Sequence, residues 1–316
     1  MPAPIRIGIC SWADKTLVDS GKFYPPEVAK KPKERLQFYG SQFDLVEVDS
    51  SFYAMPSEDN AAQWTQLTPD SFVFDVKAYG LFTGHGVNPK TIPPDIREGL
   101  PADLREKRNV YAKDLDPDVM DEMYRRFESA LLPMDSAGKL GVILFQFPPW
   151  FMPKHDNREV LRGLREKLPQ YQIAVEFRNG RWMGDYDRDR TLGVLRDAGL
   201  NYVSVDEPQG FPSSVPPVAA VTGKIGVVRF HGRNAATWTK KTETAAERFN
   251  YDYSEKELKE WLPRIEQIAE QAGEVHLLMN NCYEDKAVND ARQIGQLLSE
   301  LKPDRDFSPP QGRLPL

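Results

Sequence analysis

The stretch that decides the fold reads VVRFHGR, at residues 227–233. Side chains of a β-strand point alternately to its two faces. Val228 and Phe230 therefore share one face, and Arg229, His231 and Arg233 share the other. A strand that is apolar on one side and charged on the other is typical of a sheet whose charged face lines a functional cavity.

Seven other short segments show the same division between an apolar and a polar face. Helical patterns separate them, which is the signature of βα units and a parallel sheet. The expected strands are Ile5–Cys10, Leu45–Val48, Phe72–Lys77, Gly141–Gln146, Ile173–Phe177, Tyr202–Asp206, Gly226–His231 and Val275–Asn280. Eight such repeats predict a single-domain (β/α)8 barrel of the TIM type. An open doubly wound sheet is the alternative, but no Gly-x-Gly-x-x-Gly turn follows the first strand.

The expected helices are Lys33–Tyr39, Glu58–Gln66, Asp118–Leu131, Arg158–Leu168, Thr191–Asp197, Glu255–Gln271 and Ala287–Leu301. Two connections, Thr83–Asp116 after the third strand and Gln209–Thr222 after the sixth, exceed the usual loop length. On a barrel both lie at the C-terminal mouth, where long loops form lids or substrate walls. We expect the barrel to span residues 1–302 and the Pro-rich tail, residues 303–316, to pack loosely.

Composition limits the compartment and the partners. The 41 Lys and Arg residues face 47 Asp and Glu residues, and the net charge of −6 argues against a nucleic-acid partner. The sequence contains neither signal-peptide features nor a membrane-spanning apolar run, which predicts a cytoplasmic protein. Cys10 and Cys282 are too few for a disulfide framework and are either a redox pair or two unreactive thiols. No feature indicates a protein partner.

Strand phase assigns the side chains that face the lumen. In the seven other strands, the residues expected to face the lumen are Arg6, Gly8, Cys10, Glu47, Asp49, Asp75, Lys77, Gln146, Glu176, Arg178, Ser204, Asp206, His276, Leu278 and Asn280. These acids and bases can form a buried ion-pair network, with Arg6 and His276 as structural members. Such networks contribute little stability, however, and clustered ionisable groups are typical of functional sites. The pattern therefore favours a functional cavity.

Several motifs together resemble one known family. They are GICSW at 8–12, VEVDSSFY at 46–53, FVFDVKA at 72–78, LFQFPP at 144–149, VEFR at 175–178, RFHGR at 229–233 and Asn280-Asn281. In this order they are similar to the YecE-like family, domain of unknown function seventy-two, from residue 5 to 301. The resemblance implies a TIM-type barrel and no settled activity. Asp49 and Ser51 replace the family's usual Asn and Thr.

Four residues are candidate catalytic groups. Glu176, Asp206 and His231 lie on three successive strands and can move protons, since a histidine titrates near neutral pH. Lys77 is either a charged anchor for an anion or, if desolvated, an amine nucleophile.

Other lumen residues are expected to bind the substrate. The arginines suit carboxylate or phosphate capture, although each can instead be paired with an acid, and the asparagines suit hydroxyl groups. The set is Glu47, Asp49, Gln146, Arg178, Arg229, Arg233, Asn280 and Asn281. Tyr53 is added because it follows a strand end, as do Trp12, Trp150, Phe151 and Trp182, and such aromatic rings either stack on a sugar face or a base or pack at the rim. The set predicts an enzyme for a small anionic hydroxylated molecule, a sugar phosphate or sugar acid. Hydrolysis, lyase chemistry and isomerisation all stay open.

Two alternatives compete with this hypothesis. Glu47, Glu176, Asp206 and His231 resemble the ligands of a divalent metal in a nuclease or phosphodiesterase barrel. The neighbouring arginines would neutralise those carboxylates, so we expect no metal or other cofactor. The same pocket also suits a non-catalytic protein that binds a metabolite.

Overall fold

A computed structural model describes residues 3–240 and 245–301, and their eight strands form a closed barrel in chain order. Every neighbouring pair is parallel. The strands are β1 (Ile5–Cys10), β2 (Leu45–Val48), β3 (Val73–Lys77), β4 (Leu140–Gln146), β5 (Gln172–Glu176), β6 (Asn201–Asp206), β7 (Ile225–Phe230) and β8 (Glu274–Met279). The predicted barrel is confirmed. The proposed tail, residues 303–316, lies outside the described residues.

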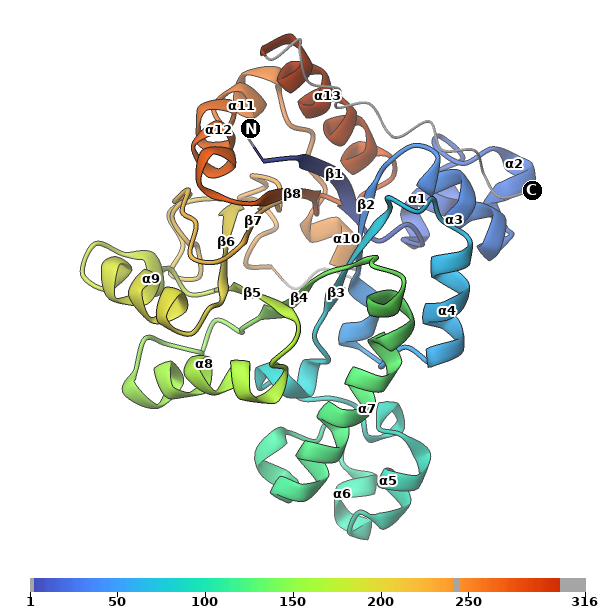
Figure 1. The fold of residues 1–316 in the computed structure, drawn as a ribbon, viewed down its shortest axis with the longest axis vertical. Helices are drawn as coiled ribbons and strands as arrows, with labels where there is room; N and C mark the ends of the chain where they lie inside the picture. The colour runs from blue at the N-terminus through green and yellow to red at the C-terminus, as the bar shows by residue number, and fades with distance from the viewer. Residues whose placement is uncertain (1–2, 241–244, 302–316) are drawn as a thin grey trace.

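Helices surround the barrel, as Figure 1 shows. They are α1 (Lys15–Ser20), α2 (Pro26–Ala29), α3 (Pro32–Gly40), α4 (Glu58–Gln66), α7 (Pro117–Ser136), α8 (His155–Lys167), α9 (Arg188–Asp197), α11 (Glu255–Lys259), α12 (Leu262–Gln271) and α13 (Lys286–Leu301). The prediction of a single helix over Glu255–Gln271 is wrong, because the helix is interrupted between α11 and α12. Pro263 has no N–H to donate to the preceding turn, and the Trp261 side chain is buried beside the break.

The two long connections differ from each other. Thr83–Asp116 contains α5 (Pro94–Gly99) and α6 (Ala102–Glu106), which form a lobe with the first turns of α7 (Figure 1). An ion pair between Arg126 and Asp95 ties this lobe to α7. The connection Gln209–Thr222 contains no helix, so β6 and β7 are joined by a loop. A further short helix, α10 (Ala245–Arg248), follows β7.

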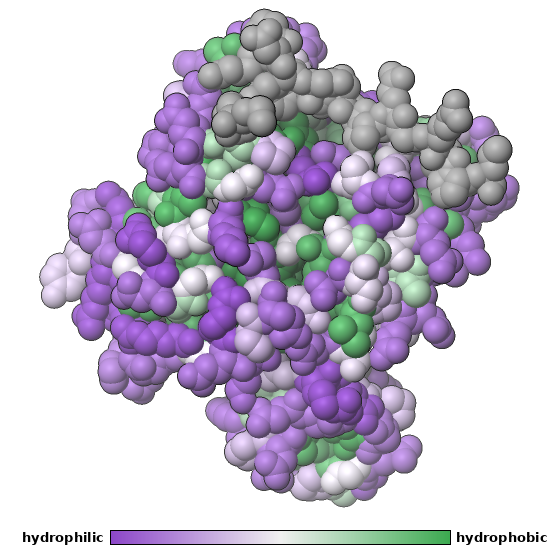
Figure 2. All heavy atoms as spheres, viewed as in Figure 1, coloured by the Kyte–Doolittle hydropathy of each residue, from purple (hydrophilic) through white to green (hydrophobic). Residues whose placement is uncertain are grey.

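Apolar side chains on the outer faces of the strands form the main core. Ile9, Val46 and Phe74 are at most 1% exposed and belong to one cluster with residues of the surrounding helices. The outward-facing surface in Figure 2 is mostly hydrophilic, with apolar groups recessed between the elements. Among the described helices, none combines the length and the apolar character that crossing a membrane requires.

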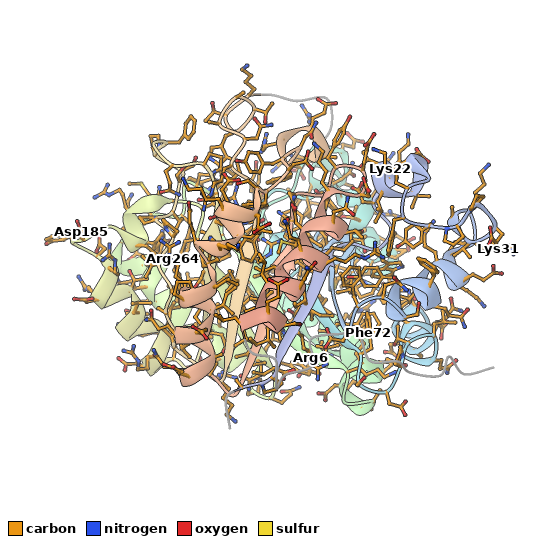
Figure 3. All side chains as sticks on the ribbon, turned by 90° about the horizontal axis from the view of Figure 1, so that it is seen from above. Arg6, Lys22, Lys31, Phe72, Asp185 and Arg264 are labelled. Atoms are coloured by element: carbon orange, nitrogen blue, oxygen red, sulfur yellow. The ribbon has the colours of Figure 1, made fainter. Side chains whose placement is uncertain are left out.

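A buried histidine–carboxylate pair closes the base of the lumen. His276 Nδ1 lies 2.9 Å from Asp75 Oδ2, and Asp75 Oδ1 accepts the Val142 N–H at 2.8 Å. Gly141 makes room for this pair, because a Cβ there would lie 2.2 Å from Asp75 Oδ1. Below them Arg6 binds Glu274 at the foot of β1, and Figure 3 labels Arg6 there. This layer is structural, as expected for His276 and Arg6.

This base layer predicts that the protein loses stability at alkaline pH. Burial alone lowers the pKa of His276, but Asp75 and Glu274 outweigh it and raise the pKa to about 9. Because the folded pKa exceeds the unfolded value near 6.5, the stabilisation is complete below pH 6.5 and disappears as the pH rises through 9. We expect urea unfolding to show a loss of about 3 kcal/mol over this range, at ~1.4 kcal/mol per pKa unit.

The matched control is His276→Gln. This variant should be less stable than the wild type at pH 6 and should lack this part of the pH dependence. Parallel stability curves for the two proteins would contradict the assignment.

Candidate functional site

The centre of the lumen is a buried arginine held between two carboxylates. Arg229 Nη1 donates to Glu176 Oε2, and Arg229 Nη2 donates to Glu47 Oε1 at 2.7 Å. All three side chains are fully buried. They come from β7, β5 and β2, and strand alternation points each of them inward. We call these three residues the arginine clamp.

A hydrogen-bonded chain continues from Glu176 toward the mouth. Its Oε1 lies 2.6 Å from the donor Gln146 Nε2 and 3.1 Å from His231 Nε2. The Asn280 amide nitrogen lies 2.8 Å from His231 Nδ1. Because an amide NH2 can only donate, Nδ1 accepts and the proton of the neutral ring lies on Nε2, where it is donated to Glu176. Burial lowers the pKa of His231 to about 4 against the attraction of Glu176, so the ring is neutral at pH 7.

Two further ion pairs lie nearer the opening. Lys77 Nζ donates to Asp49 Oδ1 at 2.7 Å, and although burial opposes the charge, Asp49 raises the pKa of Lys77. Arg178 Nη1 lies 3.0 Å from Glu207 Oε2, and its guanidinium lies 4.7 Å from the centre of the Trp238 ring. The side chains of Lys77 and Arg178 are 10% and 14% exposed, whereas Arg229 is inaccessible. They are therefore the cations of this group that a ligand can reach.

The two carboxylates of the arginine clamp have opposite acidities. Burial, only partly offset by Arg229, raises the pKa of Glu47 to about 7. Burial acts on Glu176 as well, but Arg229 and His231 outweigh it and hold the pKa of Glu176 well below its usual range. Glu47 Oε2 has no hydrogen-bond partner among the described residues. One carboxylate is thus a permanent anion, and the other can exchange a proton near neutral pH.

The expected place of Asp206 in the lumen is wrong. Its carboxylate accepts hydrogen bonds from Tyr253 Oη at 2.7 Å, Trp261 Nε1 at 2.6 Å and the Arg233 guanidinium, all outside the barrel wall. Asp206 is paired in register with the outward-facing Phe230. Asp206 thus lies on the outer face of β6, where Tyr253 and Trp261 donate to it.

Two more expected lumen residues also lie outside the site. Gly232 has φ of +82°, which ends the strand alternation before Arg233, and Arg233 binds Asp206 and Glu260 instead. Asn281 follows the inward-facing Asn280 and therefore faces out, where it donates to the Asp290 carboxylate at 2.5 Å. Asp206 and Arg233 line a second cavity of about 320 Å3, which Glu207 also borders.

Sequence reasoning missed three residues of the site. Glu207 faces the lumen beside Arg178, and burial, opposed by Arg178, raises its pKa to about 7. The opposite phase for β6, with Val203 and Val205 inward, would have located it, since small branched residues commonly fill barrel lumens. Trp238 and His85 belong to long connections, for which strand phase gives no signal.

The cysteines form no disulfide. Cys10 is buried with its Sγ 3.5 Å from Arg229 Nη2, and Cys282 Sγ donates to the Cys10 carbonyl at 3.0 Å. Burial raises the pKa of both thiols well above the ordinary value. Since the thiolate is the reactive form, the geometry favours two unreactive thiols over a redox pair.

The proposed metal ligands do not converge. Asp206 faces away from Glu176, and Arg229 occupies the space between Glu47 and Glu176. Within residues 3–240 and 245–301, no three His, Cys, Asp or Glu side chains are grouped so that they could hold a metal ion. The donor set present therefore does not fit the metal-dependent alternative.

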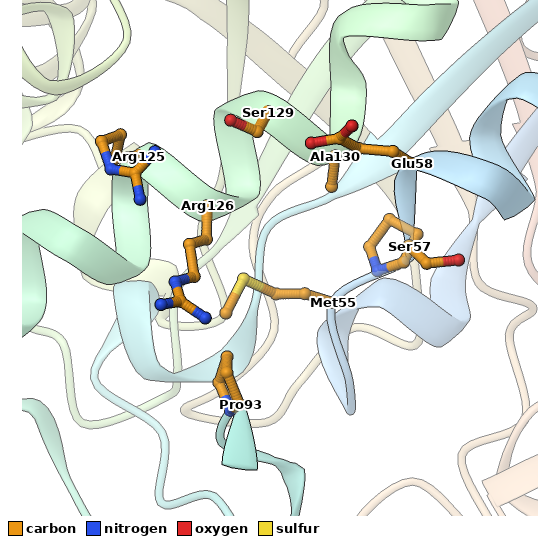
Figure 4. Close-up of a pocket in the computed structure, with 9 residues that line it drawn as sticks. Met55, Ser57, Glu58, Pro93, Arg125, Arg126, Ser129 and Ala130 are labelled. Carbon is orange, nitrogen blue, oxygen red and sulfur yellow. The ribbon is translucent and has the colours of Figure 1, made fainter. Parts of the chain in front are cut away.

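A surface cavity of about 480 Å3 lies away from this chemistry, between α4, α7 and the start of α5 (Figure 4). Met55, Arg125 and Arg126 help to line it. Arg125 binds Glu122, and Arg126 binds both Glu122 and Asp95. Its two cations already have carboxylate partners, so we assign no function to this cavity.

Comparisons with known proteins agree with the fold. A family model described as "Protein of unknown function DUF72" matches residues 6–313. The UPF0759 protein YunF of Bacillus subtilis (strain 168) is 34% identical over 298 residues, 93% of this chain and 94% of YunF. A DUF72 family crystal structure from Thermotoga maritima MSB8 shows 30% identity and a TM-score of 0.72, covering 94% of this chain and 99% of that one. One from Enterococcus faecalis V583 shows 26% identity and a TM-score of 0.74, covering 93% and 95%. The resemblance inferred from the motifs is confirmed. The names of the family and of these relatives specify no reaction.

The arginine clamp predicts unequal effects for two matched substitutions. Glu176→Gln removes a permanent anion from the buried guanidinium and should lower the free energy of unfolding by about 3–5 kcal/mol. Glu47→Gln should cost less than about 1.5 kcal/mol at pH 7, because Glu47 already carries a proton part of the time. Chemical denaturation of both variants at pH 7 measures the difference, and equal losses would contradict it.

Proposed function

The chain belongs to the DUF72 family of proteins of unknown function. We propose that it is a cytoplasmic enzyme that catalyses proton transfer to or from a small anionic molecule with hydroxyl groups. A sugar acid or a sugar phosphate has the required chemistry. The two free cysteines are consistent with a reducing compartment.

The observation that carries this proposal is the pair of carboxylates on one buried guanidinium. Neighbouring acids whose surroundings push their pKa values apart are typical of acid–base catalysis, because one stays charged while the other exchanges a proton. Glu47 has the free oxygen and the pKa near neutrality that a general acid or base needs, and because its side chain is fully buried, substrate binding must open a path to it. Glu176 is the constant anion that holds Arg229 and His231 in place.

The residues around the opening support an anionic, hydroxyl-bearing substrate. Lys77 and Arg178 supply partly exposed positive charge, and each is balanced by an acid that an incoming anion can replace. Gln146 and Asn280 carry amides that can bond to hydroxyl groups. His231 is then a positioning residue, because both of its ring nitrogens are already engaged.

The test is a thermal-shift panel of sugar acids and sugar phosphates, followed by mass spectrometry of each compound that binds. We expect at least one compound to be converted, and Glu47→Gln to lower kcat at least 100-fold with little change in binding. Lys77→Met should weaken binding at least tenfold, because it removes a reachable cation.

Arg233→Gln is the control, since Arg233 was expected in the site but lies outside it. This variant should bind and convert the same compound with unchanged constants. Turnover that survives Glu47→Gln would overturn the acid–base role, and a compound that binds without being consumed would favour a metabolite-binding protein.

A further inference from the structure

Aromatic side chains from three successive connections stand together at one side of the mouth. Phe52 and Tyr53 follow β2, His85 follows β3 and Trp150 follows β4. The ring centres lie 5.2 Å apart for Phe52 and Tyr53, 4.9 Å for Phe52 and His85, and 5.7 Å for His85 and Trp150. We call these four residues the aromatic wall.

The aromatic wall is continuous with the charged site. Lys77 Nζ lies 4.8 Å from the centre of the Phe52 ring and binds Asp49 on its other side. Burial and the nearby Asp49 raise the pKa of the Tyr53 hydroxyl, as expected for a ring beside that carboxylate. A molecule bound at Lys77 therefore has the aromatic wall directly next to it.

The outer part of the wall is unusually open. Trp150 is 65% exposed and Tyr53 is 59% exposed, whereas Trp12 and Trp182, which also follow strand ends, are 7% and 0% exposed. Packing inside the fold explains the two buried rings and does not explain the two exposed ones. Large aromatic faces in water beside a polar site are typical of surfaces that stack on a ligand.

We propose that the aromatic wall is a binding subsite for an uncharged sugar ring, joined to the anionic unit that Lys77 and Arg178 bind. The substrate is then a sugar acid or sugar phosphate that carries a second sugar. This inference rests on the proposed function and narrows its substrate class.

The chemistry of the wall favours a sugar over other occupants. Burial lowers the pKa of His85 to about 4, so the wall carries no charge of its own at neutral pH. The amides of Gln146 and Asn280 and the Tyr53 hydroxyl can bond to sugar hydroxyls beside it. Its neighbouring rings meet at 64–87°, so no two of them sandwich a flat base, and the net charge of −6 disfavours a nucleic acid. Two exposed rings are far too small for a protein interface, which needs about 800 Å2 per partner.

Calorimetric titration with two matched probes tests the inference. The one-ring probe is glucuronate, and the two-ring probe is cellobiouronate, in which glucuronate is linked to glucose. We expect the wild type to bind the two-ring probe about tenfold more tightly, which is the scale of one aromatic stacking contact. Trp150→Ala should abolish that preference and change glucuronate binding less than twofold.

Tyr186→Ala is the matched control, because Tyr186 is an aromatic residue that is 97% exposed and is not part of the aromatic wall. It should keep the preference for the two-ring probe, and the unfolding midpoint of both variants should equal that of the wild type.

The outcomes separate the two proposals. Glucuronate binding without a preference for the two-ring probe, or equal losses for both probes in Trp150→Ala, overturns the aromatic subsite and leaves the proposed function standing. Failure of both probes to bind the wild type overturns the sugar-acid form of the proposed function and the subsite with it.

Discussion

The structure depends on Arg229 being neutralised inside the barrel. Removing one ion from water costs several kcal/mol, and pairing returns that only when the geometry is good and the remaining donors are satisfied. Arg229 meets the first of these conditions by binding Glu47 and Glu176 from two other strands, while its Nε has no hydrogen-bond partner among the described residues. The partners of Glu176, among them Gln146 and His231, are in turn fixed by this requirement. The chemistry at the mouth is thus built outward from one guanidinium.

Charge is distributed along the barrel axis in two layers with different tasks. At the base, Asp75 binds His276 Nδ1 and the Val142 N–H, and Gly141 leaves room for this pair. Toward the mouth, Lys77 and Arg178 are paired but partly exposed. A lumen filled only for stability would not need the partly exposed layer, because branched apolar side chains fill barrels well. The exposed layer is where pairing can be exchanged for a ligand.

The barrel and most of its inner residues could be predicted from the sequence because strand alternation is a local property. It placed Glu47, Glu176 and Arg229 together although no two are neighbours in the chain. It failed at Asp206, where the outer face of β6 is polar because Tyr253 and Trp261 supply donors to it. It also failed after Gly232 and across Asn280–Asn281, where the strand pattern had already ended. Tyr53 was expected among the substrate-binding residues because it follows a strand end. The grouping of Phe52, His85 and Trp150 around it, and the place of Trp238, lie in connections whose course depends on tertiary contacts.

The arginine clamp also sets an order on the synthesis of the chain. Glu47 and Arg229 are 182 residues apart, and Glu176 and Arg229 are 53 apart. Both carboxylates therefore leave the ribosome well before the guanidinium that neutralises them, and an incomplete barrel keeps them in contact with water. An N-terminal fragment that ends before β7 can bury these two acids only by protonating them or by pairing them with cations other than Arg229. The barrel itself closes only when β8 pairs with β7 and β1, so the arginine clamp can be completed only shortly before the barrel closes.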